Sequence, residues 1–328
     1  MVFTLIFCVL ISIGAVWVAT SKWIQKAPEV GVTGWDMNKP EKPEIPEMGG
    51  VPLLFGFIMA VLIYVGMNTF LLNYYNYTPI FAVLCTVLMA AIIGIMDDIL
   101  GWKAGLRQWQ KPLFMLFAAL PMMAINEGQT SMVLPIIGNI NWGFLFPLFI
   151  IPIGIVIASN AYNMVAGYNG LEAGMGIIIF STMGFIALKN GKMDAVMLSF
   201  IMLGALISFL YYNWTPAKIF PGDTMTYAVG ALAACVAIIG DMEKITVFLF
   251  FLYGVDFLMQ ARGRFKKEAF GKVNSDGTLT LPFSGIYHLT HLAISILNRY
   301  KGSVYEKDVV LFVCSLEAMM AIVGIVLY

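Results

Sequence analysis

Long apolar windows are the feature that most constrains this chain. Ten stretches approach the length of about 20 mostly apolar residues that a membrane-spanning helix needs. They lie near residues 2–20, 51–68, 80–96, 111–125, 144–159, 172–188, 195–213, 225–239, 245–259 and 309–328. Only 12% of the 328 residues are charged, whereas a soluble domain has about 25%. The pattern predicts an all-α polytopic membrane protein with about ten transmembrane helices, and it excludes a soluble domain.

The chain is predicted to form a single integral membrane domain, residues 1–328. Two longer polar stretches, 21–50 and 260–308, are expected to be cytoplasmic loops. The first window has neither a basic cluster before it nor a cleavage site, so we expect a retained span rather than a signal peptide. Each cysteine stands alone within a window, which excludes a zinc-ligand spacing or a local disulfide. These are Cys8, Cys85, Cys235 and Cys314.

Positive charge is unequally divided between the two sides that ten alternating spans create. Three of the 19 Lys and Arg residues, Lys189, Lys192 and Lys244, fall on one side. The others fall on the opposite side: Lys22, Lys26, Lys39, Lys42, Lys103, Arg107, Lys111, Lys218, Arg262, Arg264, Lys266, Lys267, Lys272, Arg299, Lys301 and Lys307. By the positive-inside rule the richer side is cytoplasmic, which puts both termini outside. A net charge of zero gives no reason to expect a nucleic-acid partner.

Two adjacent acids, Asp97 and Asp98, close the third window among apolar neighbours. A single acid there would be compatible with a helix end in the headgroup region. Each acid costs about 2.5 to 3.5 kcal/mol at the bilayer centre, so a pair indicates a function with a cation or a basic group nearby.

An asparagine cluster follows the fifth window. Asn160 and Asn163 are three residues apart and share a face if the helix runs through them. Asn169 and Gly170 then indicate a tight turn. The amides offer neutral oxygen ligands for a hard cation and donors for the edge of a base. A simple helix-capping loop is the alternative.

Two further clusters flank apolar windows: one directly precedes the eighth window, and the other directly follows the ninth. Asp223 lies at a helix start, where it is either an N-cap or, with Asn163, an oxygen site for Mg²⁺. Arg262 and Arg264 belong to a basic run that either anchors the topology at anionic lipid or makes forked bonds to a diphosphate. Amphipathic spacing over 283–297 predicts an in-plane helix carrying both histidines.

The four clusters occur in an order that resembles the polyprenyl-phosphate N-acetylhexosamine-1-phosphate transferases, a family of ten-span enzymes. The resemblance runs from about Lys39 to Thr278. The matching segments are the proline-rich stretch 39–50, the paired acids with Lys111 downstream, the asparagine motif 160–174 and Phe220-Pro-Gly-Asp-Thr224. The segment Ala166-Gly-Tyr-Asn-Gly-Leu-Glu172 is similar to the eukaryotic and archaeal branch, which uses UDP-N-acetylglucosamine and dolichyl phosphate. The chain lacks the histidine-rich motif of the bacterial peptidoglycan-precursor enzymes, which argues against a muramyl-pentapeptide substrate.

This resemblance implies transfer of N-acetylglucosamine-1-phosphate from UDP-GlcNAc to a membrane polyprenyl (dolichyl) phosphate at the cytoplasmic face. The products would be polyprenyl-diphosphate-GlcNAc and UMP, and the cofactor Mg²⁺, with Mn²⁺ as the alternative. The roles carried over are catalytic for Asp97, Asp98 and Lys111, metal-binding for Asn163 and Asp223, and substrate-binding for Asn160, Asn169, Gly170, Glu172, Arg262 and Arg264.

Membrane lipid is an expected partner of such a protein. Whether the protein forms a homodimer is left undecided. The enzyme is expected in the plasma membrane of an archaeon or in the endoplasmic reticulum of a eukaryote. Two alternatives remain: a family member that uses another UDP-N-acetylhexosamine, and a transporter with functional acids. A transporter would usually place its acids near the bilayer midplane.

Overall fold

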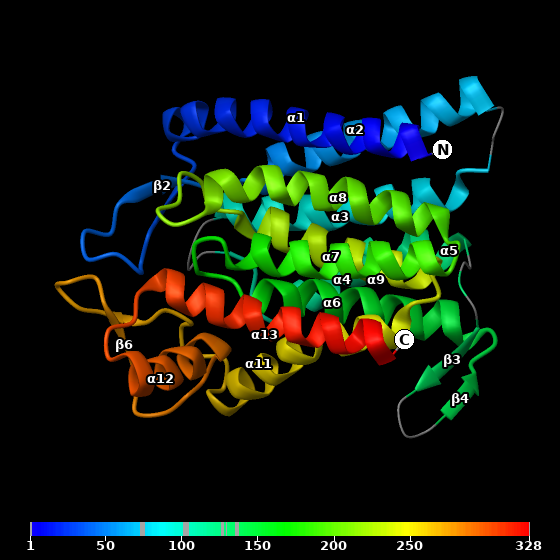
Figure 1. Ribbon diagram of the computed structural model, residues 1–328. Helices are drawn as coiled ribbons and strands as arrows, with labels where there is room; N and C mark the ends of the chain where they lie inside the picture. Colours follow the sequence, from blue (N-terminus) through cyan, green and yellow to red (C-terminus); the bar gives the residue numbers. More distant parts are fainter. Residues whose placement is uncertain are drawn as a thin grey trace.

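The structure is a computed structural model and describes residues 2–72, 76–100, 105–125, 128, 130–134 and 138–327. Within these ranges, eight helical segments are long and apolar enough to cross a membrane. They run side by side along one axis (Figure 1). They are α1 (Val2–Lys26), α2 (Gly50–Leu72), α3 (Thr78–Leu100), α6 (Ile151–Met164) with the π-helical turn Phe146–Ile150 before it, α7 (Leu171–Lys189), α8 (Met193–Asn213), α9 (Gly222–Ile239) and α13 (Glu306–Leu327).

The remaining apolar windows form interrupted helices. The fourth window becomes α4 (Gln110–Ala118) and α5 (Leu120–Ile125). The ninth becomes α10 (Glu243–Leu249) and α11 (Phe251–Arg262), which are bent by 51° at their junction. The predicted all-α membrane fold is therefore confirmed, while the number of spans and the sidedness stay predictions.

Helix α9 is the central element, and its start is fixed by close helix crossings. In its most apolar window 83% of the residues are buried. A Cβ atom at Gly94 of α3 would lie 2.5 Å from the Thr224 backbone, and one at Gly230 would lie 2.6 Å from the Ala158 carbonyl oxygen of α6. Small residues allow such approaches in membranes, where packing rather than hydrophobic exclusion holds helices together. The ends of α3, α6 and α9 are thereby brought together.

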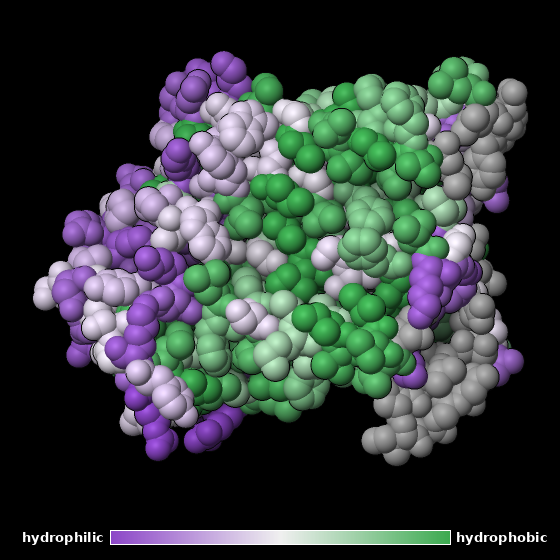
Figure 2. All heavy atoms as spheres, in the orientation of Figure 1, coloured by the Kyte–Doolittle hydropathy of each residue, from purple (hydrophilic) through white to green (hydrophobic). Residues whose placement is uncertain are grey.

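One end of the bundle is rich in hydrophilic residues (Figure 2). An apolar surface covers the middle, and hydrophilic residues gather at one end. That end carries the hairpin of β1 (Thr33–Trp35) and β2 (Glu44–Pro46), the hairpin of β5 (Lys272–Val273) and β6 (Leu279–Thr280), and α12 (Leu289–Lys301). Both termini lie at the opposite end with β3 (Ser131–Leu134) and β4 (Gly138–Asn141).

The amphipathic helix begins later than its sequence pattern predicts. It spans Leu289–Lys301 rather than 283–297. The preceding residue, His288, is extended, and the backbone N–H of Leu289 donates to Asp256 Oδ1 at 2.6 Å. A buried carboxylate from α11 therefore caps α12 and sets its start, which the local pattern could not reveal. Lys103, counted among the cytoplasmic charges, lies outside the described residues.

Candidate active site

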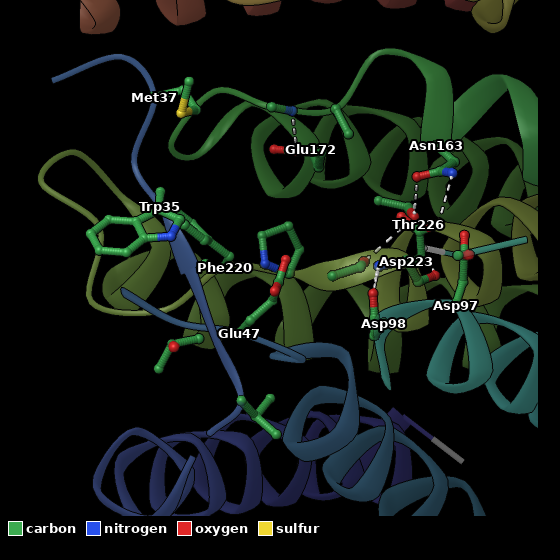
Figure 3. Close-up of a pocket in the computed structure, with 18 of the residues that line it drawn as sticks. Trp35, Met37, Glu47, Asp97, Asp98, Asn163, Glu172, Phe220, Asp223 and Thr226 are labelled. Atoms are coloured by element: carbon green, nitrogen blue, oxygen red, sulfur yellow. Dashed lines mark hydrogen bonds between the residues drawn. The ribbon is translucent and has the colours of Figure 1, made fainter. Parts of the chain in front are cut away.

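A cavity of about 1100 Å³ opens at the polar end of the bundle. Its walls come from the β1 segment, the end of α3, the start of α4, the end of α6 with the turn that follows it, and the start of α9. Figure 3 shows Asp97, Asp98, Asn163, Asp223 and Thr226 facing one another from three helices. Residues far apart in sequence thus share one polar chamber beside the apolar surface.

Lys111 links two carboxylates of the chamber. Its Nζ lies 2.5 Å from Asp97 Oδ2 and 3.0 Å from Asp223 Oδ2. Asp97 also accepts the Leu106 backbone N–H at 2.6 Å. One ammonium between two acids offsets part of their mutual repulsion, which is strong where water is scarce. The structure brings the predicted catalytic residues Asp97 and Lys111 together with the predicted metal ligand Asp223.

Asp98 has a different set of partners. Its carboxylate accepts the backbone N–H groups of Asp223 at 2.7 Å and Thr224 at 3.0 Å, and the Thr224 hydroxyl at 2.5 Å. These are the unpaired N–H groups at the start of α9, where the helix dipole also favours negative charge. Asp98 therefore acts as an N-cap supplied by another helix, although it still lines the cavity.

The surroundings of Asn163 and Asp223 fit a hard divalent cation. The Asn163 amide contacts Thr226 Oγ1 through Oδ1 at 2.9 Å, and Tyr227 Oη and Asp223 Oδ2 through Nδ2 at 3.0 and 3.4 Å. Both hydroxyls can donate or accept, so rotation of the amide would keep them satisfied and turn Oδ1 toward Asp223. One carboxylate, one amide oxygen and substrate phosphate oxygens form a donor set that suits Mg²⁺. Among the described residues no group of three or more His, Cys, Asp and Glu is arranged for another type of metal site.

The asparagine motif forms a tight turn between α6 and α7, held by its own side chains. Glu172 Oε1 accepts the backbone N–H of Gly167 at 2.8 Å. Gly170, with φ of 87°, donates its N–H to Asn213 Oδ1 at 3.1 Å. Glu172 and Asn169 line the cavity, whereas Gly170 does not. Glu172 thus shapes the turn that presents Asn169.

Three other predicted substrate-binding residues are not brought to the cavity. Asn160 donates its amide N–H to the Val156 carbonyl of its own helix. Arg262 and Arg264 are exposed and do not line the chamber. The Arg262 guanidinium lies 5.9 Å from the centre of the Tyr287 ring. Arg262 and Arg264 therefore lie outside the chamber. This position is compatible with the alternative interpretation, in which the basic run contacts anionic lipid.

Two acids that the sequence analysis did not select hold the asparagine turn. Asp36 and Glu306 are both 4% exposed, and each accepts a hydrogen bond from the Asn169 amide. Glu306 sits at the start of the last apolar helix, 137 positions from Asn169. An acid at a span boundary was the only sequence signal, and many such acids merely cap helices.

Glu47 lines the chamber with Trp35 and Phe220, on the side away from Asp97 and Asn163 (Figure 3). Burial and, secondarily, the charge of Asp98 raise its pKa from 4.5 to about 7. This carboxyl group exchanges a proton near neutral pH inside the chamber, so the charge of the cavity depends on pH. The sequence pointed only to the stretch 39–50 that contains it.

Comparison with known proteins identifies a family whose match includes Asp97, Lys111, Asn163 and Asp223. The family model for glycosyl transferase family 4 matches residues 80–241. A putative UDP-N-acetylglucosamine–dolichyl-phosphate N-acetylglucosaminephosphotransferase of Sulfolobus acidocaldarius is 34% identical over 315 residues, 94% of this chain and 91% of that protein. The corresponding Schizosaccharomyces pombe protein is 27% identical over 68% of this chain and 58% of its own length.

A phospho-N-acetylmuramoyl-pentapeptide-transferase of Lacticaseibacillus paracasei is 31% identical over 62% of this chain and 64% of its own length. The match to the Sulfolobus protein, by contrast, extends over nearly the whole of both chains. With the paired acids, the asparagine turn and the start of α9 gathered around one chamber, the chain belongs to glycosyl transferase family 4.

Proposed function

We propose that the protein transfers N-acetylglucosamine-1-phosphate from UDP-GlcNAc to a polyprenyl phosphate of the dolichyl type. The observation that carries the proposal is the convergence of Asp97, Lys111, Asn163 and Asp223 on one chamber at the polar end of an apolar bundle. The names of the relatives at 34% identity support the same donor and acceptor.

The position of the chamber suits two substrates of opposite solubility. The acceptor is a lipid whose phosphate lies at the membrane surface, and the donor is a water-soluble nucleotide sugar. They meet only where a polar cavity adjoins an apolar surface, as it does here. The gathering of the acids at one end argues against a transporter, which usually binds its cargo near the midplane.

The reaction is a substitution at phosphorus. The second pKa of a phosphate monoester is about 6, so the acceptor is mostly a dianion at neutral pH and is already nucleophilic. Its oxygen forms a bond to the sugar-bearing phosphorus, the bond from that phosphorus to the bridging oxygen breaks, and UMP leaves with the electron pair. The protein must align the two phosphates and offset their crowded negative charge.

The described residues divide that task. Lys111 supplies a cation beside Asp97 and Asp223, where phosphate oxygens can replace one carboxylate as its partner. Asn163 and Asp223 would hold Mg²⁺, which would neutralise diphosphate oxygens when bound. Asp98 keeps the start of α9, and hence Asp223, in place. Arg262 and Arg264 stay outside this scheme because they do not line the chamber.

The test is product formation by the purified protein in detergent or nanodiscs. UDP-GlcNAc, a polyprenyl phosphate and Mg²⁺ should yield UMP and a lipid product heavier by one N-acetylglucosamine-1-phosphate. A panel of other UDP-N-acetylhexosamines identifies the preferred sugar. Removal of divalent ions with a chelator should stop turnover, and adding back Mg²⁺ or Mn²⁺ should restore it.

A matched pair of variants assigns the chemistry to the chamber. Asp223→Asn should lower kcat by about 10²-fold or more, as loss of a group that stabilises transition-state charge does. Asp276→Asn makes the same change at an exposed aspartate of the β5–β6 turn and should leave kcat unchanged. Full activity of a folded Asp223→Asn protein would remove Asp223 from the metal site.

A further inference from the structure

The side-chain amide of Asn169 is held in one orientation by two carboxylates. Its Nδ2 donates to Asp36 Oδ2 at 2.8 Å and to Glu306 Oε2 at 3.2 Å. The backbone N–H of the same residue donates to Glu306 Oε1 at 2.9 Å. Both hydrogens of the NH₂ group and the backbone donor are therefore engaged on the side facing the acids.

Glu306 is the centre of a wider network. Besides Asn169 it accepts the Thr215 hydroxyl at 2.7 Å and the Asn38 amide at 3.3 Å, and it contacts the ammonium of Lys39. Lys39 Nζ also lies 3.6 Å from Asp36 Oδ2. One ammonium thus touches both acids and offsets their charge. Segments from the N-terminal loop, the α8–α9 connection and α13 meet at the asparagine turn.

The opposite orientation of this amide is excluded by the same contacts. A carboxylate can only accept hydrogen bonds, so turning the amide over would place the Asn169 carbonyl oxygen against two acceptors and leave its N–H groups unpaired. Asn163 differs because its neighbours include hydroxyls that can donate or accept. The structure therefore holds one amide in the chamber in a fixed orientation and leaves the other able to turn over.

Fixing the amide leaves Asn169 with one unused hydrogen-bonding atom. The residue lines the cavity. Among the described residues no hydrogen bond to its Oδ1 is present. The side-chain atom of Asn169 that is left for a ligand is therefore an acceptor and not a donor.

We propose that Asp36 and Glu306 are positioning residues that set base selectivity by locking Asn169 as an acceptor. This rests on the proposed use of a uridine nucleotide and takes the predicted substrate-binding residue Asn169 to contact its base. Uracil carries an N–H at ring position 3, which an acceptor oxygen recognises. Cytosine has a lone pair at that position, which would face Oδ1 without a hydrogen. A site built to pair one group rejects an analogue that leaves a buried polar atom unpaired.

The experiment compares the binding of UMP and CMP to the detergent-purified protein by titration calorimetry. Wild type should bind UMP about tenfold or more tightly than CMP, the ratio expected for one mismatched hydrogen bond. Asp36→Asn and Glu306→Gln each replace a pure acceptor with an amide that can donate to Asn169 Oδ1. With one of the two carboxylates replaced, a turned-over Asn169 amide meets one pure acceptor instead of two, so each variant should lower the UMP-to-CMP ratio severalfold, in part by raising the affinity for CMP.

Controls separate positioning from general damage. Asp308→Asn alters another α13 acid, which pairs with Lys301, and should leave the ratio unchanged. In an Asn169→Ala background the ratio should already be low, and adding Glu306→Gln should change it no further, because the effect acts only through that amide. Thermal unfolding reports whether each variant is folded. If one of the two acid variants does not fold, the other is sufficient for the test.

Three results would overturn the inference. They are equal binding of UMP and CMP by wild type, an unchanged ratio in both folded acid variants, and a further effect of Glu306→Gln in the Asn169→Ala background. Failure of the proposed function looks different, because UMP would then be bound selectively without any UMP being released from UDP-GlcNAc.

Discussion

At the scale of single residues, adjacent acids have separate partners because neighbouring positions on a helix point about 100° apart. Asp97 turns to Lys111, and Asp98 turns to the N–H groups of α9. The second contact requires Gly222, whose φ is 69° and whose added Cβ would lie 2.6 Å from Asp98 Oδ2. Backbone conformation and a close approach both exclude a side chain there.

Gly222→Ala should therefore destabilise the protein and reduce activity. A left-handed backbone costs an alanine about 1 to 2 kcal/mol, and the contact with Asp98 adds to that. Gly277→Ala is the control, because its φ is 78° but nothing lies within 4 Å of its added Cβ. Thermal unfolding should show a larger loss for Gly222→Ala than for Gly277→Ala. Equal losses would mean that the approach to Asp98 is not constraining.

Glu47 should make stability depend on pH near neutrality. Its pKa in the folded protein is about 7, against an ordinary value of 4.5, because burial and Asp98 disfavour the charged form. The folded state therefore holds this proton more tightly than the unfolded state. Stability from this group is fully present below about pH 4.5 and is lost as pH rises toward 7.

Unfolding temperatures measured between pH 5 and 8 should fall less steeply with pH for Glu47→Gln than for wild type. Glu41→Gln, an exposed change in the same loop, should follow the wild-type curve. Parallel curves for wild type and Glu47→Gln would show that Glu47 does not titrate in this range.

At the scale of elements, two helix starts are capped by acids from other helices. Asp98 of α3 caps α9, and Asp256 of α11 caps α12. Asp256 is 1% exposed and also accepts the Gln260 amide at 2.6 Å. Such caps fix the position of one helix relative to another, which an N-cap residue within the helix itself cannot do.

Removing the second cap should loosen α12 selectively. In Asp256→Ala the Leu289 N–H loses its buried acceptor, which costs about 1 to 3 kcal/mol. Hydrogen exchange measured by mass spectrometry should accelerate in the peptides of α12 and stay unchanged in α9. Asp256→Asn keeps one acceptor oxygen and should exchange at an intermediate rate. Uniform acceleration throughout the protein would indicate global destabilisation instead.

At the scale of the whole molecule, the polar end holds the chamber and the opposite end holds both termini (Figure 1, Figure 2). The number of crossings and the sidedness stay predictions. The positive-inside rule then predicts that the chamber faces the cytosol.

Cysteine labelling in intact cells tests that orientation. Lys189→Cys, at the exposed end of α7, should react with a membrane-impermeant maleimide. Lys266→Cys, in the exposed basic loop, should react only after the cells are permeabilised. Wild type, which has four free cysteines, gives the background. The reverse pattern of labelling would invert the topology.

By itself the sequence determined the membrane class and the approximate positions of the helices, because the hydropathy of a continuous stretch of residues is a local property. It also indicated Asp97, Asn163 and Asp223, since alternating spans bring their boundaries to one side, and the resemblance to the transferase family added Lys111. Only the tertiary structure decided that Asp98 caps α9, that Arg262 and Arg264 lie outside the chamber, and that Glu306 holds Asn169. Those contacts join residues more than a hundred positions apart or depend on where a loop folds back, and no local pattern encodes which distant partners will meet.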